Sequence, residues 1–232
     1  MTERHPVDWP GAGAPASAVP QTARSLLGWE ITAQGVRLRL TEVEAYAGQG
    51  QDPASHAHRG PTPRTAVMFG PPGRAYTYFV FGVHWCLNIV CGPEGEAAAV
   101  LLRAGEVLDG VELARQRRGA GPDRELARGP ARLVVTLGLG ADTNGTSLVD
   151  GTGPALLSAP TRPVEPDSVV AGPRVGVTGA HDLPWRFWIG GDPTVSAYRR
   201  HVPRRRAAPG RPSGVAENPQ APGPGDGEQS PV

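Results

Sequence analysis

The chain has 232 residues, a formal net charge of +1 and 39% hydrophobic residues. Its length corresponds to one large domain or two small ones, and no apolar stretch approaches the ~18 residues of a membrane-spanning helix, which excludes a transmembrane protein. The charge provides no positive field over the whole surface, so nucleic-acid binding would need a local basic patch. All 23 basic residues are arginine, and the two candidate patches are residues 115–132 and 199–206.

Glycine and proline are concentrated near the two ends of the chain. Residues 1–18 predict a flexible leader and residues 203–232 a disordered tail, because too little apolar surface is present to offset the entropy of ordering. We expect residues 19–202 to form one folded domain. The amino terminus has no apolar segment typical of a secretory signal peptide, and Cys86 and Cys91 are too few for a disulfide scaffold. We therefore expect a cytoplasmic protein.

The first clear element is a strand over residues 36–46, where apolar and polar residues alternate from Val36 to Thr41. If this alternation continues, Glu42, Glu44 and Tyr46 lie on the apolar face of the strand. Burial of an unpaired charge is costly. Either a β-bulge moves the carboxylates off that face, or they are held there for a purpose.

A β-hairpin is predicted next. Residues 76–81 and 83–91 are rich in aromatic and β-branched residues and are joined at Gly82, which places Phe81 and Gly82 near the tip. After a turn at residues 91–95, residues 97–103 predict a third strand.

The second half of the chain is predicted to contain helices followed by strands. Apolar spacing indicates a helix over residues 106–118, with an acidic start and a basic end that suit the helix dipole, and a helical region over residues 124–139 interrupted at Gly129 and Pro130. Residues 174–177 and 186–189 predict late strands. Because strands follow strands, we expect an α+β fold, a single domain built on a curved antiparallel β-sheet with flanking helices and a protruding β-hairpin.

Titratable and backbone-shaping residues gather in a series of short stretches. In chain order these are residues 41–46 (TEVEAY), 52–60 (DPASHAHRG), 68–73 (MFGPPG), 76–88 (YTYFVFGVHWCLN), 101–103 (LLR), 129–133 (GPARL), 174–177 (RVGV) and 186–189 (RFWI). Their order and spacing resemble the bacterial alkyladenine (3-methyladenine) DNA glycosylases, and the resemblance runs from about residue 26 to residue 196.

The resemblance implies a function and a setting. We expect a monomeric base excision repair enzyme of the bacterial cytoplasm, acting on double-stranded DNA that contains damaged purines and using no metal or organic cofactor. Its substrates would be 3-methyladenine and 7-methylguanine, with hypoxanthine and ethenoadenine as further candidates. Hydrolysis of the N-glycosidic bond would leave an abasic site.

The resemblance also implies the catalytic residues. Glu44 matches the general base that activates a water for attack on the sugar carbon, a role suited to a carboxylate, which accepts the proton and stabilises an oxocarbenium-like sugar. Arg103 would help to hold this water, and the main-chain carbonyl of Val175 would be a third contact. Glu42 is the rival carboxylate, because on an unbroken strand it shares the face of Glu44, but the motif match favours Glu44.

A further implication concerns DNA and the damaged base. An enzyme that acts on a base in duplex DNA extrudes the nucleotide and fills the gap, and Phe81, where the family often has tyrosine, matches the intercalating wedge. Arg132, near the helix start at residues 129–130, would contact the DNA backbone. Aromatic faces suit cationic alkylated purines, and an amide would obstruct the amino group of normal guanine. The matching base-pocket residues are Tyr46, Ala54, His56, Tyr78 and Asn88.

The absence of lysine bears on the mechanism independently of the resemblance. Glycosylases that also cleave the DNA strand use an amine, usually that of lysine, to form a Schiff base. This chain has no side-chain amine of that kind. A monofunctional enzyme without lyase activity is therefore favoured.

Two alternatives remain open at this point. A metal hydrolase would draw its ligands from three histidines and two cysteines, although their spacing fits no closed zinc site and Cys91 would face opposite to His84 and Cys86 on a regular strand. A noncatalytic nucleic-acid-binding module on the same scaffold is the second alternative, because a fold does not guarantee a function. The candidate metal ligands are His56, His58, His84, Cys86 and Cys91.

Overall fold

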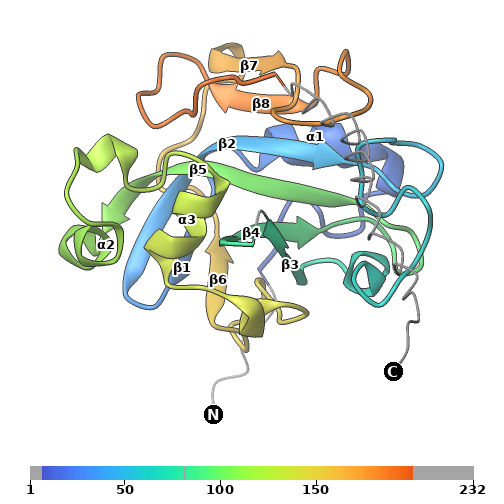
Figure 1. The fold of residues 1–232 in the computed structure, drawn as a ribbon, viewed down its shortest axis with the longest axis horizontal. Coiled ribbons are helices and arrows are strands. Elements are labelled where there is room, and N and C mark those ends of the chain that lie inside the picture. Colours follow the sequence, from blue (N-terminus) through green and yellow to red (C-terminus); the bar gives the residue numbers. More distant parts are fainter. Residues whose placement is uncertain (1–6, 81, 201–232) are drawn as a thin grey trace, which may run out of the picture. The chain divides into compact units, whose positions relative to one another are not determined.

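The structure, a computed structural model, describes residues 7–80 and 82–200. Over these residues eight strands form one curled antiparallel sheet with few helices (Figure 1), which confirms the predicted α+β class. The strands are β1 (Glu30–Ala33), β2 (Val36–Tyr46), β3 (Ala75–Val80), β4 (His84–Val90), β5 (Ala99–Asp109), β6 (Ala155–Ser158), β7 (Val169–Gly172) and β8 (Arg186–Ile189). The α-helices are α1 (Val19–Ser25), α2 (Val111–Arg118) and α3 (Pro130–Leu137). Short 3₁₀ helices cover Ala16–Ala18, Ala66–Phe69, Asp123–Glu125, Ala141–Thr143 and Pro166–Ser168.

Strand β2 is the branch point of the sheet. One of its edges pairs with β5, while the other pairs first with β1, from Val36 to Arg39, and then with β8, from Glu42 to Glu44. The strand order is β3-β4-β5-β2-β1-β6, and β7 pairs with β8. Figure 1 shows β7 and β8 on one side of β2 and β1 and β6 on the other. The carboxyl-terminal half of β2 therefore lies between β5 and β8.

Bulges in the β2–β5 ladder decide which side chains face the core. Thr41 is an extra residue in β2, and Arg103 is an extra residue in β5. Because side chains alternate along a strand, one extra residue reverses the faces beyond it, and Val43 and Ala45 become the core residues of β2. The bulge that we considered as one explanation for the carboxylates is confirmed. The side chains placed off the core face are those of Glu42, Glu44 and Tyr46.

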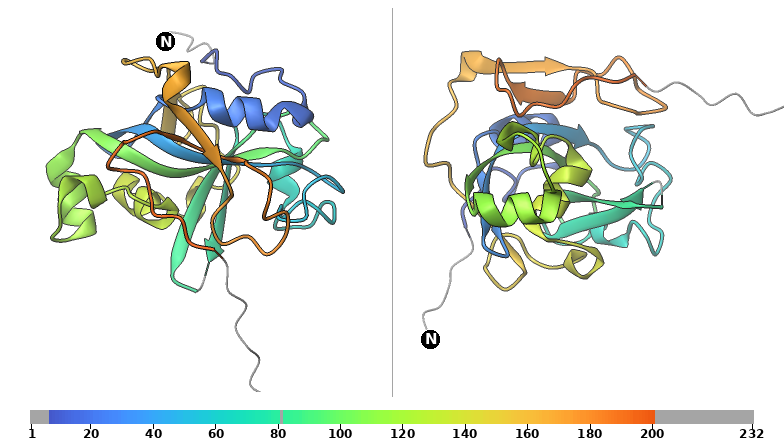
Figure 2. Two further views of the ribbon diagram at one scale, coloured as in Figure 1. Left: turned by 90° about the horizontal axis from the view of Figure 1, so that it is seen from above. Right: turned by 60° about the vertical axis from the view of Figure 1, so that its left-hand side comes forward.

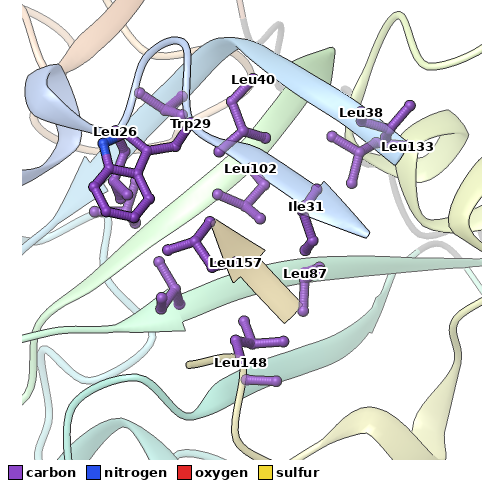
Figure 3. Close-up of a cluster of buried hydrophobic side chains, with 14 of the residues drawn as sticks. Leu26, Trp29, Ile31, Leu38, Leu40, Leu87, Leu102, Leu133, Leu148 and Leu157 are labelled. Atoms are coloured by element: carbon purple, nitrogen blue, oxygen red, sulfur yellow. The ribbon is translucent and has the colours of Figure 1, made fainter. Parts of the chain in front are cut away.

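The main hydrophobic core packs the sheet against α1 and α3 (Figure 3). Its larger members include Leu26, Trp29, Ile31, Leu38, Leu40, Leu87, Leu102, Leu133, Leu148 and Leu157. Helix α3 contacts β4 and β5, and it buries Leu133, Val134 and Leu137, which recur at helical spacing. Pro130 occupies the first turn of α3, where its missing N–H removes no helical hydrogen bond.

The predicted hairpin is confirmed. Strands β3 and β4 pair from Ala75 and Ile89 to Val80 and His84, and the hairpin projects from the body of the sheet (Figure 2). Gly82 has a φ of 70° in the connecting turn, a backbone conformation that favours glycine. Phe81, the expected wedge, lies outside the described residues, as do residues 203–232, for which a tail is predicted.

The predicted helix over residues 106–118 is wrong at its start. Strand β5 continues to Asp109, because residues 106–109 pair with β2, and this ladder overrides the local helical spacing. Helix α2 begins only at Val111, after Gly110, whose φ is 76°. A Cβ at Gly110 would lie 2.2 Å from the carbonyl oxygen of Gly35, so the turn from strand to helix requires glycine.

The predicted strand over residues 174–177 is also wrong, because β7 ends at Gly172. Pro173 has no N–H to donate to a ladder. The N–H of Val175 donates to the Glu44 carboxylate instead of to a neighbouring strand, and Gly176 has a φ of 72°. The segment therefore contacts the Glu44 carboxylate and does not extend the sheet.

Several elements have no counterpart among the sequence-based predictions, namely α1, β1, β6 and β7. Trp9 and Ala16 belong to the core cluster and are 4% and 3% exposed, so part of the segment expected as a flexible leader packs against the domain. Across residues 7–80 and 82–200, none of the helices has both the length and the apolar character needed to span a membrane.

Candidate active site

The Glu44 side chain is the centre of the candidate site. It extends from β2 just beyond the bulge and is 0% exposed. Its Oε2 accepts hydrogen bonds from Arg103 Nη1 at 3.2 Å and from the Tyr46 hydroxyl at 2.8 Å, and its Oε1 accepts one from the Val175 N–H at 2.7 Å. Three donors thus face one carboxylate, an environment that suits an ionised carboxylate because each donor satisfies one of its lone pairs.

Tyr46 is a neutral donor in this arrangement. Burial of its hydroxyl, followed by the nearby charge of Glu44, raises the pKa of Tyr46 well above its ordinary value. The phenol therefore keeps its proton at neutral pH and can donate it in the hydrogen bond to Glu44.

Arg103 links Glu44 to the second carboxylate of β2. Its Nε donates to Glu42 Oε1 at 2.7 Å, while its Nη1 donates to Glu44. Although burial opposes the charge of the guanidinium, Glu44 and Glu42 together raise the pKa of Arg103 above its ordinary value. The two carboxylates and this arginine form one continuous charged network below the protein surface.

Aromatic rings stand next to this network. The Tyr78 and His56 rings lie 4.7 Å apart in an edge-on arrangement, and Tyr76 lies 5.8 Å from Tyr78. His56 Nδ1 is 3.0 Å from the Tyr76 hydroxyl. Lost hydration, and secondarily the charge of Arg64, lower the pKa of His56 below its ordinary value, so its imidazole is neutral at pH 7. We call Tyr76, Tyr78 and His56 the aromatic wall.

Comparison with known proteins identifies the family. A family model for methylpurine-DNA glycosylases (MPG) matches residues 15–193. The chain belongs to the methylpurine-DNA glycosylase family. The resemblance expected from the sequence is thereby confirmed, and it supports a DNA glycosylase of DNA repair, which is a hydrolase of N-glycosyl bonds.

Bacterial relatives agree with this membership. A protein of Streptomyces avermitilis, named "Putative 3-methyladenine DNA glycosylase", is 56% identical over 173 residues, covering 74% of this chain and 81% of the relative. A protein of Frankia casuarinae with the same name is 50% identical over 192 residues, covering 79% of this chain and 89% of the relative. A protein of Leifsonia xyli subsp. xyli, again with this name, is 48% identical over 204 residues, covering 83% of this chain and 93% of the relative.

The structure of this glycosylase-family chain brings Glu44, Arg103, Val175 and Tyr46 into direct contact. Val175 contacts Glu44 through its N–H, while the role that the resemblance implies is that of its carbonyl. Asn88 lies on β4 opposite Tyr76 and donates from Nδ2 to the Tyr76 carbonyl at 3.0 Å.

A buried ion pair that sequence reasoning missed supports the loop between Tyr46 and His56. Arg174 donates to both carboxylate oxygens of Asp52, at 2.5 and 2.8 Å, and to the Ala45 carbonyl. Asp52 in turn accepts the N–H of Ala54, one of the expected base-pocket residues, at 3.0 Å. The Arg174 guanidinium carbon lies 4.7 Å from the Tyr46 ring centroid. A signal was present, because both residues begin stretches of the family motif, but their pairing was not visible.

Three arginines of the predicted basic patch, Arg115, Arg128 and Arg132, form ion pairs with neighbouring acids. Arg132, the expected DNA-backbone contact, forms an ion pair with Glu125. Arg115 pairs with Asp123 at 2.8 Å and also with Glu112. Positive charge near the start of α3 is therefore smaller than the sequence suggested.

The candidate metal ligands are dispersed. Cys91 belongs to the main core with Leu87, whereas Cys86 faces the opposite side of β4, as expected for a regular strand. Within the part of the chain that the structure describes, no three His, Cys, Asp or Glu side chains gather closely enough to hold a metal ion.

Proposed function

We propose that the protein hydrolyses the N-glycosidic bond of alkylated or deaminated purines in duplex DNA, with Glu44 as the general base. The observation that carries the proposal is the buried Glu44 carboxylate, which faces three hydrogen-bond donors beside an aromatic wall. Membership in the methylpurine-DNA glycosylase family supports the same reaction.

The reaction uses Glu44 to accept one proton from a water molecule. The water oxygen forms a bond to C1′ of the deoxyribose, the bond from C1′ to the purine nitrogen breaks, and its electron pair leaves with the base. A purine such as 3-methyladenine or 7-methylguanine carries a positive charge in DNA and departs as a neutral base. The products are a free base and an abasic site. Arg103 and the backbone of Val175 hold the carboxylate and its water in this proposal.

Recognition of the base is assigned to aromatic faces. Tyr46 and the aromatic wall would enclose the extruded purine, and a cationic base gains about 0.5–2 kcal/mol from such a face. A neutral His56 supports this assignment, because an imidazolium would repel the cation. Ala54 would line the pocket, and Asn88 would exclude the amino group of normal guanine. We assign the wedge to Phe81 and a phosphate contact to Arg132, on the sequence match to the family.

The chain has no lysine, so the Schiff-base route of a lyase lacks its usual amine. We therefore propose a monofunctional enzyme that acts as a monomer in the bacterial cytoplasm. The family assignment to bacterial relatives supports this setting.

The proposal is tested by base release from duplexes that contain 3-methyladenine, 7-methylguanine or hypoxanthine. The wild-type protein is expected to release base, with strand breaks appearing only after alkali treatment. Glu44→Gln removes the proton acceptor and is expected to slow release by about 10²–10⁴-fold, the usual contribution of a general base. Glu96→Gln, which alters an exposed carboxylate, is the matched control and should retain wild-type activity.

Each failure has a distinct meaning. Strand breaks without alkali would contradict a monofunctional enzyme. Undiminished release by Glu44→Gln would remove Glu44 from the role of general base. If well-folded wild-type protein binds lesion DNA but releases no base, the protein is a noncatalytic nucleic-acid-binding module.

A further inference from the structure

Glu42 carries a second buried carboxylate beside the site. It is 0% exposed and lies two residues before Glu44 on the same face of β2. Its Oε1 accepts from Arg103 Nε and from Arg186 Nε, each at 2.7 Å, and from Ser196 Oγ at 2.9 Å. Its Oε2 accepts the Ser196 N–H at 2.7 Å. This carboxylate therefore has four donors, although the proposed chemistry gives it no direct part.

We infer that Glu42, clamped by Ser196, is a positioning residue that anchors Arg103 and draws part of its charge away from Glu44. The inference rests on the proposed function, because it concerns the ability of Glu44 to act as a base. It assigns to the rival carboxylate a role in the reaction that is different from proton acceptance.

The contact distances support an anchoring role. Arg103 is 2.7 Å from Glu42 but 3.2 Å from Glu44, so the closer contact fixes the guanidinium and the looser one reaches the base. Arg186 also pairs with Glu42, so the positive charges of two arginines match the negative charges of two carboxylates. Without the charge of Glu42, Arg103 would interact with Glu44 alone. An undivided opposite charge stabilises an ionised carboxylate and makes it a poorer proton acceptor.

The segment from Thr194 to Ser196 fixes the positions of Glu42 and Arg186. Ser196 donates twice to Glu42, and its carbonyl accepts from Arg186 Nη2 at 2.7 Å. The hydroxyl of the bulged Thr41 lies 2.7 Å from that of Thr194, which anchors the same segment. The bulge that turns Glu42 off the core face therefore also provides the attachment point of the segment that clamps it.

The other titratable groups near Glu44 do not change their charge under mildly acidic conditions. Arg103 approaches from β5, Tyr46 from the same strand, Tyr78 from β3 and Cys86 from β4. Burial raises the pKa of Tyr46, Tyr78 and Cys86, so these three groups stay neutral under mildly acidic conditions. Glu42 is consequently the neighbouring negative charge whose removal changes the protonation of Glu44.

The test measures steady-state base release by the full-length protein as a function of pH and of substrate concentration. Glu42→Gln is expected to lower kcat by about 10-fold to 100-fold, as for a misplaced catalytic group. It should also move the acid limb of the profile to lower pH, because Arg103 then interacts with Glu44 without a competing negative charge. KM should change little, because Glu42 does not touch the base in this arrangement.

Two milder variants separate charge from geometry. Glu42→Asp keeps the charge but shortens the side chain, so kcat should fall while the acid limb stays at the wild-type pH. Ser196→Ala removes one of the four donors and should lower kcat several-fold without moving the acid limb. If Glu42→Gln fails to fold, Glu42→Asp and Ser196→Ala still test the inference. A wild-type kcat in both of them would overturn it.

Glu30→Gln is the matched control for a purely structural carboxylate. Glu30 is buried on β1 and accepts from Arg37 and from the Thr161 N–H. This variant should be less stable but should keep the wild-type kcat and acid limb. If Glu42→Gln keeps the wild-type acid limb and kcat, the inference is overturned but the proposed function is not. Inactive wild-type protein would instead overturn the proposed function, and the inference with it.

Discussion

Two groups of arginines in this protein have opposite surroundings. Arg103, Arg174 and Arg186 are far apart in the sequence, yet each is at most 6% exposed and pairs with a carboxylate that is 0% exposed. The arginines around α2 and α3 are close together in the sequence, and Arg115, Arg128 and Arg132 among them pair with acids that are partly or well exposed.

The comparison shows that the density of charge along a chain does not locate its chemistry. An ion pair in water is screened and contributes little. A buried pair is different, because each charge has lost its hydration and loss of one partner leaves the other uncompensated. The scattered arginines are therefore the ones on which the candidate site depends.

The largest expected effect comes from breaking a buried pair. Asp52→Asn leaves the Arg174 guanidinium buried without its counter-charge, and we expect a loss of about 3–5 kcal/mol in the free energy of unfolding, measured by urea denaturation. The matched exposed change, Asp123→Asn, should leave the urea midpoint unchanged within error. Equal losses in the two variants would contradict the distinction between the groups.

An intermediate effect is expected from Arg64, which lies near the aromatic wall but outside both groups. Lost hydration and then the charge of Arg64 lower the pKa of His56, so Arg64→Gln should raise this pKa toward its ordinary value. The shift can be followed by NMR titration of the imidazole. Arg59→Gln is the control and should leave the His56 titration as in wild type.

The same titration predicts a pH dependence of binding. A lowered pKa means that the neutral imidazole is favoured in the folded protein and becomes charged only as the pH falls through that pKa. The preference of Glu44→Gln protein for a 7-methylguanine duplex over an undamaged one should therefore decline in mild acid. If the preference for the 7-methylguanine duplex declines equally after His56→Asn, protonation of the imidazole is not the cause.

The smallest expected effect concerns the exposed arginines. Arg132 already pairs with Glu125, so Arg132→Ala should lower the slope of log affinity against log salt by less than the ~0.9 expected for one phosphate contact. Glu125→Gln frees the guanidinium and should strengthen binding to undamaged duplex. Fluorescence anisotropy at several salt concentrations measures both effects, and weaker binding by Glu125→Gln would argue against a phosphate contact from Arg132.

Local sequence signals predicted much of the sheet. The strands predicted over residues 36–46 and 186–189 and the hairpin predicted around Gly82 correspond to β2, β8 and the β3–β4 pair. Residues 106–109 and 174–177 were predicted wrongly because distant partners decide their conformation. The first stretch pairs with β2, and the second supplies donors to Glu44 and Asp52.

The candidate site could be predicted only as a set of residue types. The motif match pointed to Glu44, Arg103 and Tyr46, which the structure brings together. The four donors of Glu42 could not be found in the same way, because its contacts span 61, 144 and 154 positions along the chain. No local pattern encodes a contact of that length.

By itself the sequence determined that the chain has no lysine amine, that two carboxylates follow an alternating apolar run, and that aromatic runs joined at Gly82 predict a hairpin. Only the tertiary structure decided that the carboxylates leave the core face. The decision depends on the bulges at Thr41 and Arg103 in the β2–β5 ladder. A shift of one residue reverses every side chain beyond it, and that register is set by pairing between strands distant in sequence.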